Sequence, residues 1–200
     1  MNLYVVRHGN TFLEKQVPVR IGQKTNLPLV ESGVNQAVEL GKYFLREKII
    51  FDVVFCSFLD RTKQTADLIM NYQPNQILPI QDVLFNEIDH GIDEGKSDTE
   101  IKLRIGEKAL FDWDQYGIVP EGWIVDEENR KKEWRIFINK YKDKFENILV
   151  VTSNGSARFL LKSFNFSNDI PNLKLRTGSF SKINFQDENR VVIKQWDKRP

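Results

Sequence analysis

One of the chain's two histidines, His8, stands directly between Arg7 and Gly9. An imidazole can act as a nucleophile, and the planar, permanently charged guanidinium group of arginine matches phosphate oxygens. Glycine lets a ligand approach the backbone closely. The tripeptide is a weak pattern by itself, but its residue types together favour a site for a phosphoryl group.

Two further stretches carry residues of matching chemistry. Arg61 lies near the expected start of a helix, where backbone N–H groups also favour an anion; the alternative is a solvated Arg61 on a surface helix. Glu87 belongs to an acidic stretch over residues 82–94. A carboxyl group beside a phosphoryl site can donate a proton to a leaving group. The residue types leave open which carboxyl group does so.

The hydrophobic pattern predicts the elements that must position these residues. Strands are predicted for residues 3–6, 51–56, 76–80 and 148–152, and helices for residues 62–70 and 157–161. A further helix is expected to begin with Ser32 as its N-cap. Its apolar face would consist of Val34, Val38, Phe44 and Leu45.

Residues 180–185 and 190–196 are predicted to form a hairpin around Asp187-Glu188-Asn189. Strands that alternate with helices indicate an α/β fold. We therefore expect a mostly parallel sheet with this hairpin at one edge.

Ligands bind α/β sheets at the carboxyl ends of the parallel strands. Four polar segments follow predicted strands of this chain: residues 7–9, 57–61, 86–87 and 153–155. If those strands are parallel, the four segments meet at one end of the sheet.

Residues 96–135 show a weaker pattern, in which Trp113, Trp123 and Trp134 lie among many charged residues. We interpret this segment as an insertion that caps the site. The alternative is an ordinary peripheral helical segment whose aromatic side chains form a small core.

Composition narrows the class of protein. The net charge of +1, from 29 Lys+Arg and 28 Asp+Glu, argues against sequence-independent binding of nucleic acid. A hydrophobic content of 40% argues against disorder. The single cysteine, Cys56, excludes an internal disulfide and is expected to be a buried thiol. With no apolar run of about 18 residues and no secretory leader pattern, we expect a cytoplasmic protein that forms one domain over residues 1–200 and binds no membrane.

At these positions the chain resembles the histidine phosphatase superfamily, the phosphoglycerate mutase-like proteins. Arg7 to Thr11 is similar to the family's Arg-His-Gly-Glu-Thr sequence, and residues 25–37 are similar to the stretch that follows it. Ser57 to Ala66 matches the second arginine motif, Glu87 to Gly95 resembles the acid motif, and residues 148–158 match in the C-terminal half.

The resemblance implies a three-layer α/β sandwich, with helices on both faces of a mostly parallel sheet and a small helical insertion over the site, at residues 96–135. It also implies a mechanism. His8 attacks a phosphomonoester and becomes a phosphohistidine, Arg7 and Arg61 hold the phosphoryl oxygens, and Glu87 protonates the leaving oxygen. No metal or other cofactor is expected, because the arginines stabilise the charge.

The chain departs from the family at Asn154, which stands where the family usually has the histidine of a Ser-His-Gly motif. The Asn154 amide can donate a neutral hydrogen bond, whereas charge-assisted hydrogen bonds are roughly twice as strong. We therefore expect Asn154 to bind the phosphoryl group and to slow the reaction.

Three smaller departures surround the expected site. Asn10 replaces the usual glutamate and is expected to contact phosphate. Glu14 replaces a usual asparagine and is expected to point away from the phosphate or to meet a cation such as Arg20. We interpret His90, which follows Glu87 in the acid motif, as a supporting residue rather than a phosphate ligand.

These observations favour a metal-independent phosphomonoester hydrolase that acts on a small phosphorylated substrate. The alternative is a catalytically weakened relative that binds a phosphorylated ligand or partner. A phosphoglycerate mutase is a lesser alternative, because the mutases of this family carry a longer insertion. The pattern identifies neither the substrate nor the oligomeric state.

Overall fold

The computed structural model describes residues 1–168, 172–187 and 190–200. The predicted hairpin turn at Asp187-Glu188-Asn189 lies largely outside these ranges. Within them, no helix combines the length and the apolar character that crossing a lipid bilayer requires.

The molecule is built on a six-stranded sheet with the strand order β3-β2-β4-β1-β5-β6. The strands are β1 (Asn2–Arg7), β2 (Val53–Cys56), β3 (Ile80–Gln81), β4 (Asn147–Thr152), β5 (Phe180–Asp187) and β6 (Arg190–Lys198). β1, β4, β2 and β3 run parallel, while β5 is antiparallel to both β1 and β6. This confirms the predicted parallel sheet with a hairpin at its edge.

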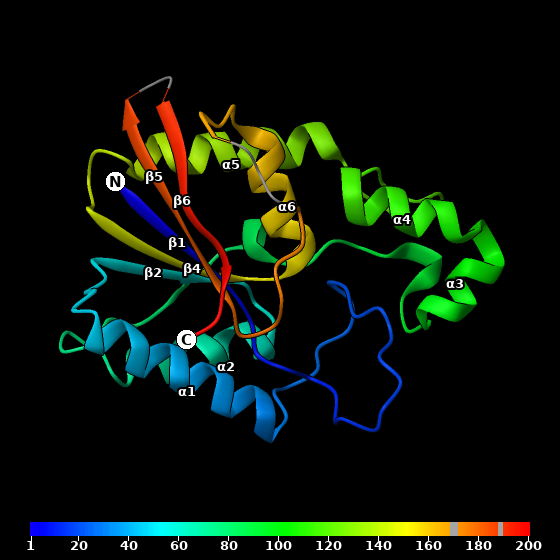
Figure 1. Ribbon diagram of the computed structural model, residues 1–200, viewed down its shortest axis with the longest axis horizontal. Coiled ribbons are helices and arrows are strands. Elements are labelled where there is room, and N and C mark those ends of the chain that lie inside the picture. The colour runs from blue at the N-terminus through cyan, green and yellow to red at the C-terminus, as the bar shows by residue number, and fades with distance from the viewer. Residues whose placement is uncertain (169–171, 188–189) are drawn as a thin grey trace.

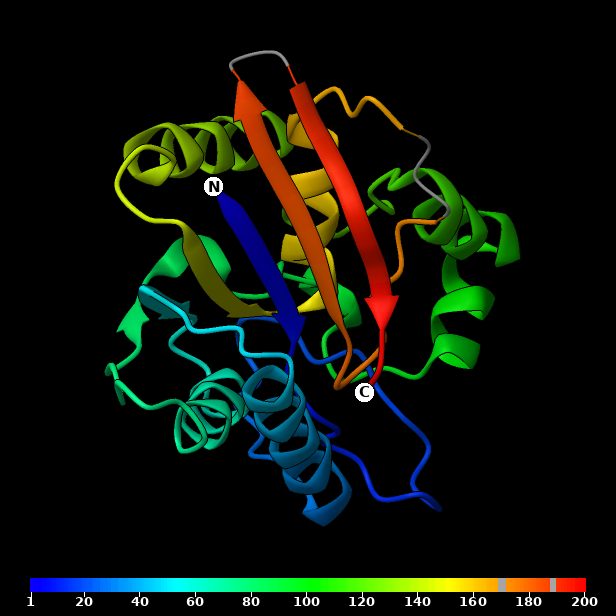
Figure 2. The same cartoon turned by 60° about the vertical axis from the view of Figure 1, so that its left-hand side comes forward.

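Helices cover both faces of the sheet, as Figures 1 and 2 show. One face carries α1 (Glu31–Arg46) and α2 (Asp60–Met70), and the other carries α5 (Glu127–Tyr141) and α6 (Asn154–Ser163). α3 (Asp98–Ile105) and α4 (Glu107–Tyr116) lie to one side of these layers, and two single 3-10 turns, η1 (Val83–Phe85) and η2 (Gly91–Asp93), follow β3. The three-layer fold is confirmed.

Side-chain alternation along the strands divides the core into two parts. Leu3 and Val5 of β1 pack in the core under α5 and α6, whereas Tyr4 and Val6 pack in the core under α1 and α2. Successive side chains of a strand point to opposite faces, so continuous apolar runs are required in a strand that is covered on both sides. The predicted buried thiol is confirmed, since Cys56 lies in the second core, where burial raises its pKa to about 12.

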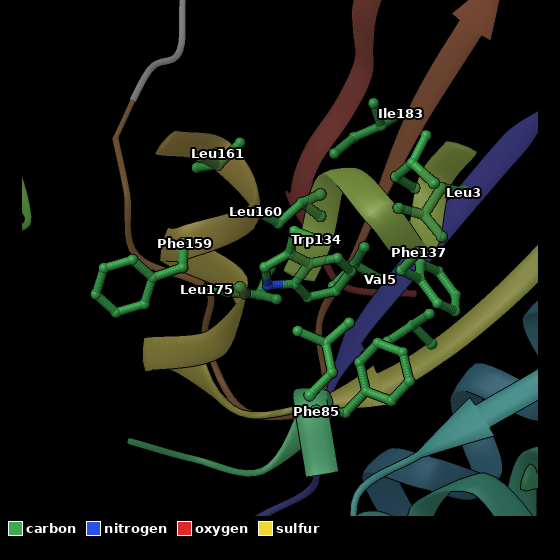
Figure 3. Packing of buried hydrophobic residues seen from close by; sticks show 14 of the residues in the cluster. Leu3, Val5, Phe85, Trp134, Phe137, Phe159, Leu160, Leu161, Leu175 and Ile183 are labelled. Carbon is green, nitrogen blue, oxygen red and sulfur yellow. The ribbon is translucent and has the colours of Figure 1, made fainter. Parts of the chain in front are cut away.

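The core under α5 and α6 is the larger of the two. Figure 3 shows Trp134 and Phe137 of α5 packed with Phe85 and with the strand residues Leu3 and Val5. Trp113 and Trp123 also belong to this core, so the three tryptophans of residues 96–135 are core residues. Residues 127–135 form the start of α5 and therefore lie in the helical layer.

Two local expectations were wrong. Ser32 does not cap its helix, because α1 begins at Glu31 after Val30. The buried face carries Ala37, Leu40 and the predicted Phe44, but not the predicted Val34, Val38 and Leu45. The third strand is paired only at Ile80 and Gln81, not over residues 76–80. Pro79 has no N–H group to donate to a strand ladder, which explains the late start of this strand.

Phe85 provides a test of this packing, because its buried ring contacts the rings of Phe55, Trp134 and Phe137. We expect Phe85→Ala to lower the free energy of unfolding by about 3–5 kcal/mol, since it leaves a cavity in the core. Phe111→Ala is the matched control, because Phe111 is 54% exposed, and it should change stability by no more than about 0.5 kcal/mol. Urea unfolding measures both variants. Equal losses of unfolding free energy for the two would contradict the packing described.

Candidate active site

The four polar segments that follow the parallel strands meet at one end of the sheet, as predicted. The His8 N–H donates to the Thr152 carbonyl oxygen (3.0 Å), and the Gly9 N–H donates to Thr65 Oγ1 of α2 (3.1 Å). The Phe58 N–H donates to Asn86 Oδ1 (3.1 Å). Residues far apart in the sequence are thereby assembled into one site.

Glycine is required where the first segment leaves the sheet. A Cβ atom on Gly9 would lie 2.3 Å from the Gly33 carbonyl oxygen, which is far below a van der Waals contact. The close approach of Gly9 to Gly33 brings the residue after His8 against the first turn of α1.

His8 is buried, and its Nδ1 lies 2.8 Å from the Gly9 carbonyl oxygen. Because a carbonyl oxygen can only accept, Nδ1 carries the proton and Nε2 keeps its lone pair. Burial and the nearby charges of Arg61 and Arg7 lower the pKa of His8 well below its ordinary value of 6.5. The imidazole is therefore neutral near pH 7 and presents Nε2 as a nucleophile.

Two buried guanidinium groups lie close enough to His8 to affect its titration. Arg7 Nη1 donates to the Leu175 carbonyl oxygen (2.8 Å). Arg61 Nη1 donates to the Thr25 carbonyl oxygen (2.7 Å), and its Nη2 donates to that of Gly22 (3.1 Å). Burial lowers the pKa of Arg7 to about 10, against an opposing effect of Glu87, so Arg7 remains charged at neutral pH.

Each of these arginines also keeps a buried Nε atom that has no hydrogen-bond partner in the described part of the chain. An unpaired buried donor is costly unless a ligand satisfies it. Arg7 and Arg61 are therefore suited to bind the oxygens of an anion beside His8.

Glu87 reaches this site from the segment that follows η1. Its Oε1 accepts hydrogen bonds from the N–H groups of Ile88 and Gly155, each 2.9 Å away. A Cβ atom on Gly155 would lie only 2.3 Å from that oxygen, so a side chain at position 155 would displace the carboxyl group. The start of α6 thus fixes where Glu87 stands.

Asn154, the first residue of α6, accepts a hydrogen bond at Oδ1 from the Leu175 N–H (2.8 Å). This bond sets the orientation of the amide, since only the oxygen can accept. None of the hydrogen bonds among residues 1–168, 172–187 and 190–200 uses Nδ2 of Asn154 as a donor, so this group can serve a ligand. The backbone of Leu175 thus binds both residues, Asn154 through its N–H and Arg7 through its carbonyl oxygen.

Asn10, two residues after His8, is held by other protein atoms. Its Oδ1 accepts from the Thr177 hydroxyl group, and its Nδ2 donates to Ser32 Oγ (3.3 Å). The Nδ2 group has two hydrogens, so Asn10 can keep its bond to Ser32 and still donate the second hydrogen to a phosphoryl oxygen.

His90, the second histidine, braces the loop that holds Arg61. Its ring packs edge-on against Trp123 with centroids 4.4 Å apart, and its Nδ1 lies 3.6 Å from Glu94 Oε2. Glu94 in turn accepts from the Gly22 N–H (2.7 Å) and from the Thr25 hydroxyl group. This placement agrees with the supporting role predicted for His90.

The sequence analysis did not single out Glu94 as a residue that supports the site. Burial raises the pKa of Glu94, but its contacts with His90, Thr25 and Gly22 outweigh that effect and hold the pKa below its ordinary value. The resulting carboxylate holds residues 22 and 25, whose carbonyl oxygens accept hydrogen bonds from Arg61.

Arg158 is a second residue that the sequence analysis missed. It lies buried in α6, with its guanidinium group 4.3 Å from the centre of the Trp113 ring and 2.9 Å from Asp114 Oδ1. Its charge contributes to the lowered pKa of Arg7. Arg158 therefore links α4 to the end of the sheet where Arg7 and Arg61 lie. In the sequence, only its position in an otherwise apolar helix face could have indicated this role.

Glu14 is exposed, and it forms no salt bridge with Arg20 in the described structure. Arg20 pairs instead with Asp98 (2.8 Å), and its guanidinium group lies 5.6 Å from the centre of the Trp123 ring. The loop over residues 10–30 is thereby attached to the start of α3.

The assembled groups can perform phosphoryl transfer. They combine a neutral imidazole nucleophile, two fixed cations and a carboxyl group, all at the carboxyl ends of parallel strands. In the ranges that the structure describes, no cluster of three or more His, Cys, Asp or Glu residues could hold a metal ion.

A family model described as the histidine phosphatase superfamily (branch 1) matches residues 3–198 of the chain. A 2,3-bisphosphoglycerate-dependent phosphoglycerate mutase of Rhodopseudomonas palustris (strain BisB18) is 33% identical over 122 residues. This match covers 60% of the chain and 58% of that mutase, so the chain aligns with little more than half of the curated relative.

Two solved structures share the fold over the whole chain. The α-ribazole phosphatase of Shigella flexneri superposes with a TM-score of 0.73 at 22% identity, covering 100% of this chain and 97% of that one. A phosphoglycerate mutase of Bacillus anthracis str. Sterne superposes with a TM-score of 0.81 at 24% identity, covering 98% and 92%. At such identities, these structures establish the fold alone.

The site geometry predicts that His8 stays neutral, with its proton on Nδ1, at pH values well below 6.5. Nitrogen and carbon NMR of the labelled imidazole during an acid titration measures this directly. Arg61→Gln should raise the pKa of His8 toward its ordinary value, because it removes a nearby positive charge and leaves the burial in place. A His8 ring that titrates near pH 6.5, or that carries its proton on Nε2, would contradict the site described.

Proposed function

We propose that this chain, which belongs to the histidine phosphatase superfamily, hydrolyses a small phosphomonoester through a phosphohistidine on His8. One observation carries the proposal: the neutral, buried imidazole of His8 lies beside two arginines whose buried Nε–H donors have no partner among the described residues. A phosphoryl group placed there would satisfy both donors and face the free Nε2 of His8.

In the first step, His8 Nε2 attacks phosphorus and forms the N–P bond while the bond to the ester oxygen breaks. Arg7 and Arg61 stabilise the charge on the phosphoryl oxygens. Protonated Glu87 transfers its proton to the leaving oxygen, so that an alcohol departs. The Gly9 carbonyl oxygen stabilises the Nδ1–H of the charged phosphohistidine.

In the second step, water attacks the phosphohistidine and the N–P bond breaks. The Glu87 carboxylate accepts a proton from that water, and His8 returns to its neutral form as phosphate leaves. The carboxyl group thus regains the proton that it lost in the first step. Charge stabilisation by the arginines lets both steps proceed without a metal ion.

Asn154 contributes a neutral hydrogen bond from Nδ2 to a phosphoryl oxygen. A positively charged donor at this position would stabilise the transition state by about 1.5–3 kcal/mol more. This difference corresponds to a rate roughly ten to a hundredfold lower with Asn154. The protein that we propose is therefore an active phosphatase with a reduced rate of turnover.

The same residue favours a second candidate function. A chain that keeps Arg7 and Arg61 but lacks the cationic donor at position 154 can bind a phosphorylated ligand with little turnover. The complete set of His8, Arg61 and Glu87 supports the hydrolase over this binding role.

The first test measures hydrolysis of an aryl phosphate in excess chelator by the wild type and by His8→Ala. We expect turnover that resists chelation, an acid-labile phosphoenzyme in the wild type, and neither in the variant. His90→Gln is the matched control, because it removes the other imidazole and should retain the phosphoenzyme. Equal turnover by His8→Ala would refute the nucleophile, and phosphate binding without turnover by the wild type would favour the binding role.

The second test changes the donor at position 154. Asn154→His should raise kcat by about ten to a hundredfold at constant stability, since a protonated imidazole supplies charge to the transition state. Asn154→Asp is nearly isosteric and keeps an acceptor for the Leu175 N–H, but it adds a negative charge and should abolish turnover. Unchanged kinetics in both variants would remove Asn154 from the site.

A further inference from the structure

The loop over residues 174–179, which leads into β5, holds two of the groups that would bind phosphate. The Leu175 carbonyl oxygen accepts a hydrogen bond from Arg7 Nη1, and the Leu175 N–H donates to Asn154 Oδ1. The loop itself contains no helix or strand. Contacts from elsewhere in the chain must therefore fix its shape.

The end of β6 and the residue that follows it supply such contacts. β1 and β6 are both antiparallel to β5, so the two strands run in the same direction and end at the same side of the sheet (Figure 2). Trp196 Nε1 donates to the Lys174 carbonyl oxygen (3.1 Å), and Arg199 Nη2 donates to that of Thr177 (2.9 Å). The end of β6 thereby lies against the loop that holds the site.

Asp197 of β6 makes the most extensive of these contacts. Its Oδ1 accepts from the Arg176 N–H (2.7 Å) and from the Ser179 hydroxyl group (2.7 Å). Its Oδ2 accepts from Arg176 Nε (2.6 Å), and its carbonyl oxygen accepts from Arg176 Nη2 (2.9 Å). One residue therefore holds both ends of the turn over residues 176–179.

The backbone of Asp197 lies in the left-handed region, with a φ of 55°. This region is costly for residues other than glycine, although Asp and Asn adopt it more readily than most. Such a conformation persists only where the surrounding contacts fix it, and it is concentrated at functional sites. Glycine at position 197 would relieve the backbone but would remove the carboxylate that holds the loop.

The connection from Asp197 to the site is short. The Arg176 N–H and the Leu175 carbonyl oxygen belong to one planar peptide group. Asp197 holds the N–H side of this group, and Arg7 donates to its carbonyl oxygen. Fixing one side of a rigid plane fixes the direction of the other, so the carboxylate determines where the acceptor of Arg7 points.

Stabilisation of the fold explains this arrangement poorly. The side chain of Arg176 is 51% exposed, and an exposed ion pair contributes little to stability. A single residue that concentrates several bonds on one turn, in a costly backbone conformation, is better explained by the need for a precise position.

We propose that Asp197 is a positioning residue for the phosphoryl site. It acts through the backbone of Leu175, whose carbonyl oxygen sets the guanidinium group of Arg7 and whose N–H sets the amide of Asn154. This role rests on the function proposed above, since it concerns the same phosphoryl group. Without the Asp197 carboxylate, both ligands of that group lose their fixed positions together.

Two substitutions at position 197 test this role. Asp197→Gly removes the carboxylate but suits the left-handed backbone, so the variant should fold. Its dissociation constant for inorganic phosphate, measured by isothermal titration calorimetry, should rise by about tenfold or more, because misplaced ligands bind the phosphoryl group poorly. Asp197→Asn tolerates the same backbone and keeps one acceptor oxygen, so its dissociation constant should lie between those of the wild type and Asp197→Gly.

Asp52→Gly is the matched control. The Asp52 carboxylate also holds backbone N–H groups, those of Glu146 and Asn147 (2.8 Å each), but it does so at the opposite end of the sheet. Asp52→Gly should lower the free energy of unfolding in urea and leave the phosphate dissociation constant unchanged. The same pattern in Asp197→Gly would show a structural role alone and would overturn the proposal.

NMR of the phosphate-free protein separates this role from the proposed function. In Asp197→Gly, the side-chain signals of Arg7 and Asn154 should shift, while those of Arg61 stay in place, because a different loop holds Arg61. We expect these shifts whether or not the wild type hydrolyses a phosphomonoester. Unchanged Arg7 and Asn154 signals in Asp197→Gly would overturn the role of Asp197, whereas a wild type without turnover would count only against the hydrolase.

Discussion

Two guanidinium groups buried beside a neutral imidazole are the constraint on which the site depends. Transfer of a cation out of water is expensive unless protein groups replace its hydration. The carbonyl oxygens of Leu175, Thr25 and Gly22 supply part of that replacement, and they come from loops rather than from the sheet. The loops are therefore as necessary as the strands, and their cost in conformational entropy is part of preparing the site for an anion.

The sheet supplies the rigidity that these loops lack. β1 lies between β4 and β5, and the N–H of His8 is fixed by the Thr152 carbonyl oxygen at the end of the parallel ladder. Helices on both faces prevent the strand from shifting, because β1 places alternate side chains in two separate cores. A nucleophile held in this way needs little reorganisation before it reacts.

The sequence analysis identified the strands, the hairpin and the segments around His8, Arg61, Glu87 and Asn154, because short apolar runs and local motifs carry that information. It could not identify Leu175, Glu94 or Arg158, since each acts through contacts with residues distant in the sequence. It misplaced the start of α1 and the third strand, where Ser32 and residues 76–80 satisfy a local rule that tertiary contacts override. The division of residues 96–135 between α3, α4 and the start of α5 was equally invisible, because these residues combine charged surface with core tryptophans.

The pairing of β1 with β5 also constrains how the chain reaches its native state during translation. β1 emerges from the ribosome well before its neighbours β4 and β5, and before Leu175, whose carbonyl oxygen accepts a hydrogen bond from Arg7. Contacts so distant in sequence form late and slowly. Until the C-terminal hairpin is released, the central strand has an open edge and Arg7 lacks its carbonyl partner. The nascent chain thus becomes competent to bind an anion only after Leu175 and β5 have been released.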